Sequence, residues 1–413
     1  MRHWTIKCPV CKVDFKTVDS GICGACGTRL VVSYAASSRQ RESNTLSGRG
    51  LWRYRHLLPV SDDLTPITMG EGDTPLVRSC WIGPSVGFKE LYFKLEFCNP
   101  TGSFKDRIAS LMVSRWASEG VSTLLCITSG NAGSAIAAYG TRAGLRSIIL
   151  YLAEAPPSKS LQMHAYGASV LVLEGISESP GNLNRVFSDM FALGRSHNWG
   201  VVVMSHRFDP INVEAYKTIA FEICDELQTS RPDVLYSPVG GGGLFAAIWK
   251  GFGEHDTSRY EPYKPRMIAV QPAGAASVAA GIADGKDDAV PVPVNSRISG
   301  VSAPHSSDGN LVIKAIKETG GHCSCPTDDE IYQAQSQLAE KEGLFAEPAG
   351  AVAVAGFIKD ASEGRIDTNN RVVCIVSASG FKDSEAATRL FMNQSIKTIR
   401  FDELDRIAGL VGV

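Results

Sequence analysis

The stretch "TLLCITSGNAG" (Thr123 to Gly133) decides the fold class. Its first five residues form a short apolar run, a turn of small residues follows, and an alanine-rich stretch with a helical pattern comes next. A short apolar run that ends in a glycine turn is typical of a buried strand, and here that strand passes directly into a helix. We therefore predict a strand, a tight turn and a helix at this point of the chain.

The same alternation continues along the chain. Strand-like apolar runs recur in "SIILYLA", "SVLVLEG", "GVVVMS", "VLYSPVG", "MIAVQP" and "VVCIVSASG". Amphipathic helical patterns lie between them, such as "INVEAYKTIAFEICDEL" and "DEIYQAQSQLAEKEG". Strands that alternate with helices predict parallel sheets covered by helices on both faces, which is the α/β class. Ligands of such sheets bind beyond the carboxyl ends of the strands, so we expect the loops at those ends to carry the chemistry.

Length and composition limit the kind of protein this can be. The chain has 413 residues, more than one ordinary core holds, which predicts two or three domains. Its net charge of -2 gives no electrostatic reason to expect nucleic acid or an anionic membrane as a partner. No apolar run is long enough to span a bilayer, and "MRHWTIKCPVC" lacks the apolar core of a signal peptide. The expected location is the cytoplasm.

The N-terminal segment contains two CxxC pairs, "CPVC" and "CGAC", which contribute Cys8, Cys11, Cys23 and Cys26. Each pair can direct two thiolates at one ion, and two pairs complete a tetrahedron, so a structural Zn²⁺ site is predicted. A segment of about 30 residues has too little core to fold alone, so the metal would supply much of its stability. The alternatives are a ribbon that has lost its metal and a redox-active cysteine pair.

Two loops that follow predicted strands are suited to binding anions. In "TSGNAG" (Thr128 to Gly133), small residues and a helix N-terminus present free N–H groups, and Asn131 can donate to a phenolate-type oxygen. In "SPVGGGG" (Ser237 to Gly243), four glycines leave no side chain between the backbone and a phosphate, and a helix begins near Leu244. This loop lacks the GK[ST] of a Walker loop, and it does not match the GxGxxG pattern of dinucleotide-binding proteins. Taken singly, the first loop could be a capped turn and the second merely flexible.

Two further loops supply a lysine and a hydroxyl. "NPTGSFKDR" (Asn99 to Arg107) contains Lys105, which is either a nucleophile whose amine forms a Schiff base or part of a surface turn. "VSASGFKD" (Val376 to Asp383) places Ser377 after the last apolar strand, where it could bond to a ring nitrogen or cap the next turn. A lysine, a glycine loop, an asparagine and a serine match the aldehyde, phosphate, phenolate and pyridine nitrogen of pyridoxal 5'-phosphate.

With these motifs in this order, the chain resembles the threonine synthase family, fold-type II pyridoxal-phosphate enzymes with an N-terminal four-cysteine zinc ribbon. "SFKDR" with the glycine loop is specific for the superfamily, and the ribbon with "GLWRYRHLLP" narrows the resemblance to threonine synthases. Other matching stretches are "MGEGDTPLV", "EAYKTIAFEI", "PVGGGGLFAAIWKGF" and "EGLFAEPAGA". The resemblance extends from the first residues almost to the last.

The resemblance implies a tryptophan synthase beta-like arrangement of two parallel-sheet α/β domains behind the ribbon. The ribbon would occupy residues 1–33, followed by a linker at 34–49. A large cofactor-binding domain would combine residues 50–93 with 200–395, and a small domain would take 94–199. Residues 396–413 would form a C-terminal tail.

The resemblance also implies a role for each matching position. Lys105 would be the Schiff-base lysine, Asn131 would contact the phenolic oxygen, and the hydroxyl of Ser377 would face the pyridine nitrogen. The cofactor phosphate would be bound by Gly240, Gly241, Gly242 and Gly243. The substrate carboxylate would be bound by Thr128, Ser129, Gly130, Asn131 and Ala132. Glu347 in "FAEPAG" matches a position near the cofactor, or it is a capping acid before Pro348.

Around the substrate the chain departs from the family's pattern. Threonine synthases bind the substrate phosphate with an Asn–Ser pair and an arginine, and the matching positions here are His206, Arg207 and Asn212 in "SHRFDPIN". Arg207 is the guanidinium that could replace the missing arginine in substrate binding. "RISGVSAPHSSDG" and "SASG" also replace family stretches, and Ala132 replaces a threonine. These changes spare the cofactor positions, so we expect the cofactor chemistry to be retained while the substrate could differ.

The function implied by the resemblance is that of a pyridoxal-phosphate-dependent lyase of amino-acid biosynthesis. It would convert O-phosphohomoserine and water into threonine and phosphate, as a homodimer. The alternative is β-replacement or β-elimination on a phosphoserine-, serine- or threonine-type substrate, as in a cysteate synthase or a dehydratase. A non-enzymatic binding protein on the same fold is a third possibility, but it would have no need of Lys105.

Overall fold

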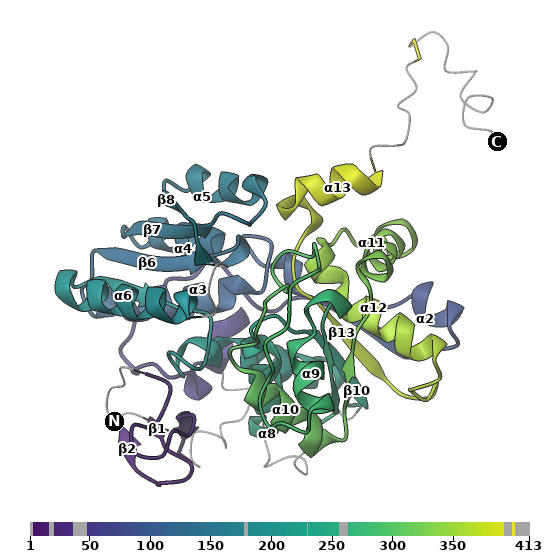
Figure 1. Cartoon of the computed structure of the whole chain (residues 1–413), viewed down its shortest axis with the longest axis horizontal. Coiled ribbons are helices and arrows are strands. Elements are labelled where there is room, and N and C mark those ends of the chain that lie inside the picture. The colour runs from purple at the N-terminus through teal and green to yellow at the C-terminus, as the bar shows by residue number, and fades with distance from the viewer. Residues whose placement is uncertain are drawn as a thin grey trace.

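The computed structural model describes residues 3–15, 20–35, 48–176, 181–228, 230–255, 263–391 and 399–400. They contain a three-stranded, a six-stranded and a four-stranded sheet (Figure 1). The first is the antiparallel sheet of the N-terminal segment, in which β1 (Trp4–Lys7) lies between β2 (Asp14–Phe15) and β3 (Val31–Tyr34). None of the described helices is long and apolar enough to cross a membrane.

The six-stranded sheet has the order β12-β11-β10-β13-β5-β4, and it is parallel except that β4 pairs antiparallel to β5. Its strands are β12 (Cys323–Ser324), β11 (Arg266–Val270), β10 (Val234–Pro238), β13 (Val372–Val376), β5 (Leu91–Leu95) and β4 (Leu76–Arg78). Alternate side chains of an apolar strand point to opposite faces. Leu235 therefore shares a core with α7 (Thr218–Leu227), α8 (Gly243–Glu254) and α10 (Gly309–Thr319), whereas Tyr236 shares another with α11 (Asp328–Glu342) and α12 (Pro348–Ser362).

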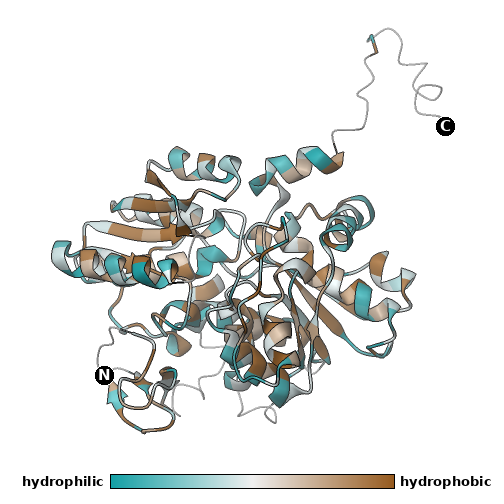
Figure 2. Cartoon of the chain, viewed as in Figure 1, coloured by the Kyte–Doolittle hydropathy of each residue, from teal (hydrophilic) through white to brown (hydrophobic). Residues whose placement is uncertain are grey.

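The four-stranded sheet is entirely parallel, with the order β8-β7-β6-β9. Its strands are β8 (Ser169–Leu173), β7 (Arg146–Leu152), β6 (Thr123–Thr128) and β9 (Gly200–Val202). Leu124 and Cys126 of β6 share a core with α3 (Lys105–Ser118) and α4 (Asn131–Arg142), and Leu125 and Ile127 share another with α6 (Asn182–His197). Figure 2 shows apolar strands with helices on both sides of them. This arrangement confirms the predicted α/β class.

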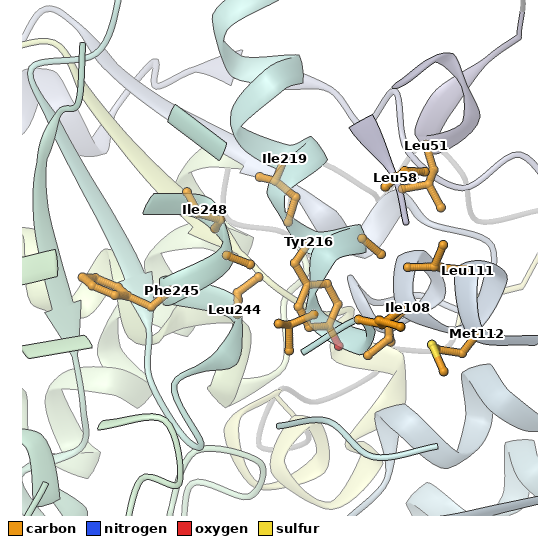
Figure 3. Packing of buried hydrophobic residues seen from close by; sticks show 14 of the residues in the cluster. Leu51, Leu58, Ile108, Leu111, Met112, Tyr216, Ile219, Leu244, Phe245 and Ile248 are labelled. Atoms are coloured by element: carbon orange, nitrogen blue, oxygen red, sulfur yellow. The ribbon is translucent and has the colours of Figure 1, made fainter. Parts of the chain in front are cut away.

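The shorter elements connect these layers. The remaining α-helices are α2 (Ile82–Ser85), α5 (Leu161–Ala165), α9 (Ser277–Ala283) and α13 (Ser384–Phe391). The 3-10 helices are η2 (Gly50–Leu57), η3 (Glu96–Cys98), η4 (Pro157–Ser160), η6 (Asn212–Lys217), η7 (Ala273–Ala275) and η8 (Gly380–Lys382). Figure 3 shows Tyr216 of η6 between Leu244 of α8 and Ile108 of α3, so this ring joins helices that belong to different sheets.

Two of the predicted domain boundaries fall at strands of the large sheets. The strand β5 belongs as a whole to the six-stranded sheet, although the predicted boundary at 93/94 falls inside it. The strand β9 pairs with β6 of the four-stranded sheet, although residues from 200 onward were expected in the large domain. Residues 36–47 of the predicted linker, and residues 396–398 and 401–413 of the predicted tail, lie outside the described residues.

Candidate active site

A cavity of about 310 Å³ lies where β6, β10 and β13 end, between the four-stranded and the six-stranded sheet. The sequence-predicted residues that line it are Lys105, Thr128, Ser129, Asn131, Ala132, Gly240, Gly241, Gly242, Gly243, Glu347 and Ser377. These positions are far apart in the sequence. They meet because parallel strands bring their carboxyl ends, and the loops that follow, to one edge of each sheet.

The loop that carries Lys105 is tied to the loop that carries Ser377. The backbone N–H of Phe104 donates to the carbonyl of Ser377 (3.1 Å), and the N–H of Ser379 donates to the carbonyl of Gly102 (2.9 Å). Lys105 is the first residue of α3, so these bonds fix the start of that helix beside the end of β13.

The Lys105 amine lies against aromatic rings. Its Nζ is 4.4 Å from the ring centroid of Phe104 and 5.6 Å from that of Tyr216. Within the described part of the chain, no carboxylate pairs with this amine. Burial lowers the pKa of the Lys105 amine to about 8, and the nearby Cys126 thiol opposes that shift. A lowered pKa supplies the unprotonated amine that a lysine nucleophile needs.

The glycine loop joins β10 to α8 and has the shape of a phosphate cradle. Gly242 has a φ of +99°, and a Cβ there would lie 2.9 Å from Cγ2 of Val312, so glycine is required. The N–H of Asp308 donates to the carbonyl of Gly241 (2.8 Å) and fixes the loop from outside. The first N–H groups of a helix have no partner within the helix, and α8 begins at Gly243. An anion at this point would meet backbone donors and the positive end of the helix.

Ser377 follows β13 directly and is 4% exposed. Its hydroxyl lies 3.4 Å from the carbonyl oxygen of Ala349, a long and therefore weak hydrogen bond that another acceptor could replace. A neutral hydroxyl can donate to a pyridine nitrogen without protonating it. The amine, the glycine cradle and this hydroxyl line one cavity, so the residues present fit pyridoxal phosphate.

Asn131 is held by a buried ion pair. Its Nδ2 donates to Oε1 of Glu347 (2.7 Å), and Nζ of Lys159 donates to Oε2 of the same carboxylate (2.9 Å). Burial alone would lower the pKa of Lys159, but the carboxylates of Glu347 and Asp383 outweigh it and raise that pKa. Glu347 occupies the N-cap position of α12, yet its side chain makes no capping hydrogen bond. Its carboxylate instead lines the cavity and orients the side chain of Asn131.

The loop predicted to bind the substrate carboxylate is shaped by its own first residue. Oγ1 of Thr128 accepts hydrogen bonds from the N–H groups of Gly130 (2.9 Å) and Gly133 (3.2 Å). Ser129, Asn131 and Ala132 line the cavity at the start of α4, whereas Gly130 does not. Thr128 thus acts through the loop geometry, and an anion would meet the residues around Asn131.

Arg207 lies apart from the other predicted substrate-binding residues. It lines a second cavity, between the N-terminal ribbon and α10, and not the cavity that contains Lys105. Nδ2 of the neighbouring Asn212 donates to the carbonyl of Val203 (2.5 Å), and burial lowers the pKa of His206 to about 3. His206 and Asn212 are buried, so they pack this loop and do not face the active-site cavity.

Several residues of the cavity had no predicted role. Its apolar wall includes Ile127, Leu152, Leu183, Phe187, Met204 and Tyr216, and its further polar residues are Lys159, Ser205, His305 and Ser307. His305 and Ser307 fall within "RISGVSAPHSSDG", the stretch that departs from the family, which was the available signal. Nothing in "APPSKS" indicates that Lys159 meets Glu347, because its partner lies in a distant helix.

The four ribbon cysteines form the predicted cluster. The sulfurs of Cys8, Cys11, Cys23 and Cys26 all lie within 4.8 Å of one another. Two of the pairs, Cys8–Cys26 and Cys11–Cys23, are 3.4 and 4.0 Å apart. Zn–S bonds of about 2.3 Å in a tetrahedron place sulfurs about 3.8 Å apart, so the donor set fits one Zn²⁺.

The comparisons with known proteins agree with this geometry. Residues 67–378 match the family model described as pyridoxal-phosphate dependent enzyme. The chain is 37% identical over 349 residues to the threonine synthase of Methanocaldococcus jannaschii, covering 82% of each chain. It is 33% identical over 387 residues to the threonine synthase of Methanosarcina acetivorans, covering 92% of each.

Solved structures show the same fold at lower identity. Maize serine racemase aligns with a TM-score of 0.63 at 21% identity, over 78% of this chain and 92% of that one. Threonine deaminase isoform 2 of Solanum lycopersicum aligns with a TM-score of 0.60 at 21% identity, over 82% and 83%. These two structures support the architecture.

Proposed function

We propose that this chain, which belongs to the pyridoxal-phosphate dependent enzyme family, is a threonine synthase that converts O-phosphohomoserine and water into threonine and phosphate. One observation carries the reaction class: a single cavity gathers the Lys105 amine, the glycine cradle, Asn131 and Ser377. The substrate is inferred from the relatives, which are threonine synthases and which match this chain over most of their length.

The cofactor would be held at both of its ends by this chain. Lys105 is the candidate for the covalent bond to the aldehyde. Asn131 would donate a hydrogen bond to the phenolic oxygen, and the loop from Gly240 to Gly243 would bind the phosphate. The hydroxyl of Ser377 would donate to the pyridine nitrogen. When bound, pyridoxal phosphate supplies an electron sink for a carbanion at the α-carbon of an amino acid.

Lys105 is the group best placed to move protons. With a pKa near 8, a useful fraction of its amine is unprotonated at neutral pH and can accept the α-proton. Loss of a leaving group at Cγ also requires a proton to leave Cβ, and the same amine lies within the cavity to take it. The aromatic rings of Phe104 and Tyr216 limit where the amine can move.

The substrate would be anchored by its two anionic ends. The carboxylate would lie at the start of α4, near Ser129 and Asn131. No arginine is among the described residues that line the cavity, so the substrate phosphate would rely on His305 and on Lys159, whose amine also pairs with Glu347. Ser205 is less available, because its hydroxyl already donates to Asp308 (3.0 Å). This differs from the arginine contact expected of the family.

The metal and the assembly complete the proposal. The four ribbon cysteines would bind a structural Zn²⁺, since four thiolates leave no open coordination position for catalysis. The resemblance to the family further implies a cytoplasmic homodimer. Size-exclusion chromatography with light scattering, and metal analysis of the purified protein, test these two points.

The experiment that tests the reaction uses purified, cofactor-loaded protein and four parallel substrates. O-phosphohomoserine, O-phosphoserine, serine and threonine are supplied, and threonine, phosphate and keto acid are measured. We expect threonine and phosphate in equal amounts from O-phosphohomoserine alone. Keto acid from serine or threonine, without threonine from O-phosphohomoserine, would instead assign a dehydratase.

A substitution at His305 tests the proposed phosphate contact. His305→Asn should raise the KM for O-phosphohomoserine more than it lowers kcat, because a substrate contact is lost while Lys105 is untouched. An unchanged KM would remove His305 from the phosphate site.

A further inference from the structure

The second cavity, of about 450 Å³, lies between the ribbon and the six-stranded domain. Its polar walls come from Arg29 of the ribbon, Arg207 and Asp288 of two loops, and Asn310 and Lys314 of α10. Arg207 is the residue for which the sequence suggested substrate binding. Its position here, beside two other basic residues, requires a different explanation.

The cavity is built by a close contact between the ribbon and the large domain. The N–H of Gly21 donates to the carbonyl of Arg207 (3.0 Å), and a Cβ on Gly21 would lie 2.1 Å from the carbonyl oxygen of His206. Only glycine permits this approach. The contact fixes the ribbon against the loop that carries Arg207, so the backbones that carry Arg29 and Arg207 are held close together.

Arg29 is buried but has an unused donor. The residue is 8% exposed, and its Nη2 donates to the carbonyl of Ser307 (2.7 Å). Its Nη1 is buried without a hydrogen-bond partner among the described residues, and so is Oδ1 of Asn310. Unsatisfied buried donors and acceptors destabilise the free protein, so a ligand that satisfied them would be favoured.

The charge of the cavity is positive. Arg29, Arg207 and Lys314 contribute three positive charges and Asp288 contributes one negative charge, while the nearby carboxylate of Asp308 also acts on Arg29. The cavity also includes Asn310, in the first turn of α10, where the helix dipole favours an anion. Three cationic groups and a helix N-terminus suit a doubly charged phosphate, which accepts several hydrogen bonds at once.

We propose that this cavity is a binding site for a small phosphorylated molecule, separate from the active site. Its volume lies within the range of small-molecule pockets, about 300–1,000 Å³. The phosphate would be bound by Arg29, Arg207 and Lys314, and Asn310 would accept a hydrogen bond from a hydroxyl or amino group of the remainder. The proposal does not depend on which amino acid the active site converts.

The site is connected to the cofactor loop through two consecutive residues, Ser307 and Asp308. The carbonyl that accepts from Arg29 belongs to Ser307, which also lines the active-site cavity. The next residue, Asp308, donates its N–H to the carbonyl of Gly241 and accepts from the N–H of Arg207 (3.0 Å). A ligand that draws Arg29 toward itself would act on this segment, so its binding should alter cofactor affinity, and the reverse.

Calorimetric titration of the full, cofactor-loaded and zinc-loaded chain tests the proposal. The probes are inorganic phosphate and adenosine monophosphate, with acetate as a singly charged comparison. Lys314→Glu is compared with Lys317→Glu, which changes another exposed lysine of α10 that does not line the cavity. Both variants keep the active site, so a difference between them reports on the second cavity.

We expect Lys314→Glu to weaken phosphate binding at least about tenfold, and Lys317→Glu to leave it as in the unaltered chain. Arg29→Met should have the same effect as Lys314→Glu, and Arg29→Lys a smaller one. Reactivity of the four ribbon thiols shows whether the ribbon is still folded in the Arg29 variants. Equal phosphate affinity in Lys314→Glu and Lys317→Glu would overturn the proposal.

Discussion

Replacing Gly242 by alanine tests whether the glycine loop has the shape that a cofactor phosphate needs. Gly242 has a φ of +99°, and a Cβ there would lie 2.9 Å from Cγ2 of Val312 and 3.3 Å from Cβ of Asp308. A non-glycine residue held in such a conformation costs about 1–3 kcal/mol. Forcing a methyl group into a packed region costs about 1–3 kcal/mol more, so the total is at least about 2 kcal/mol.

The neighbouring Gly241 provides a matched control. A Cβ on Gly241 would lie 3.4 Å from Oγ of Ser307, which is an ordinary contact, and its φ is not in the positive region. Without a bound phosphate the altered loop can relax, so the cost of about 2 kcal/mol is met when the loop takes up the cradle conformation on binding, which corresponds to about a thirtyfold change in affinity. We expect Gly242→Ala to bind pyridoxal phosphate at least about thirtyfold more weakly, and Gly241→Ala to remain within about threefold of the unaltered chain.

The assay is a titration of cofactor-free protein with pyridoxal phosphate, followed by the visible absorbance of the lysine-bound cofactor. Circular dichroism of both variants establishes that the α/β domains are folded. Equal weakening in the two variants would mean that added bulk, and not the conformation of Gly242, limits binding. A Gly242→Ala variant with unchanged affinity would refute the phosphate cradle.

Three further outcomes are expected. Burial lowers the pKa of Lys105 to about 8, so its free amine forms at a lower pH than that of an exposed lysine. The rate at which the protein captures pyridoxal phosphate should therefore rise about tenfold between about pH 7 and about pH 9. Stopped-flow absorbance measures this rate, and a midpoint above about pH 10 would contradict the prediction. Removing metal with a chelator should expose four additional reactive thiols and weaken phosphate binding at the second cavity, as a thiol assay and calorimetry would show. Arg107→Met leaves Glu96 and Glu222 buried without their shared guanidinium and should cost at least about 3 kcal/mol in urea unfolding, more than Arg107→Lys.

The fold could be predicted from the sequence wherever both faces of a strand are buried. The residues of β6, β10 and β13 are buried throughout, so each appears in the sequence as a mainly apolar run. Parallel strands align their carboxyl ends, so the loops after β10 and β13 lie at one edge of the six-stranded sheet, and the loop after β6 lies at the corresponding edge of the four-stranded sheet. That reasoning brought together Asn131, the glycine loop and Ser377, which line one cavity in the structure. The binding roles of these residues remain predictions.

Partners across domains could not be predicted in the same way. Lys159 and Glu347 form an ion pair of 2.9 Å between the short 3-10 helix η4 and the start of α12. Neither neighbourhood has a sequence pattern that names the other. The strand β9 illustrates the same limit, because its three residues, Gly200–Val202, carry no signal of the sheet they join, and the structure pairs them with β6.

Arg207 shows that the position of a residue in the sequence does not determine which cavity its side chain lines. Ser205, two residues earlier, lines the active-site cavity, whereas Arg207 lines the cavity beside the ribbon. What separates them is Asp308, whose carboxylate accepts from the hydroxyl of Ser205 and from the backbone N–H groups of His206 and Arg207. Asp308 and Gly21 together turn the loop, and both are remote in sequence from it. An arginine near a family's phosphate position can therefore belong to a different anion site, and measuring phosphate binding with Lys314→Glu distinguishes the two.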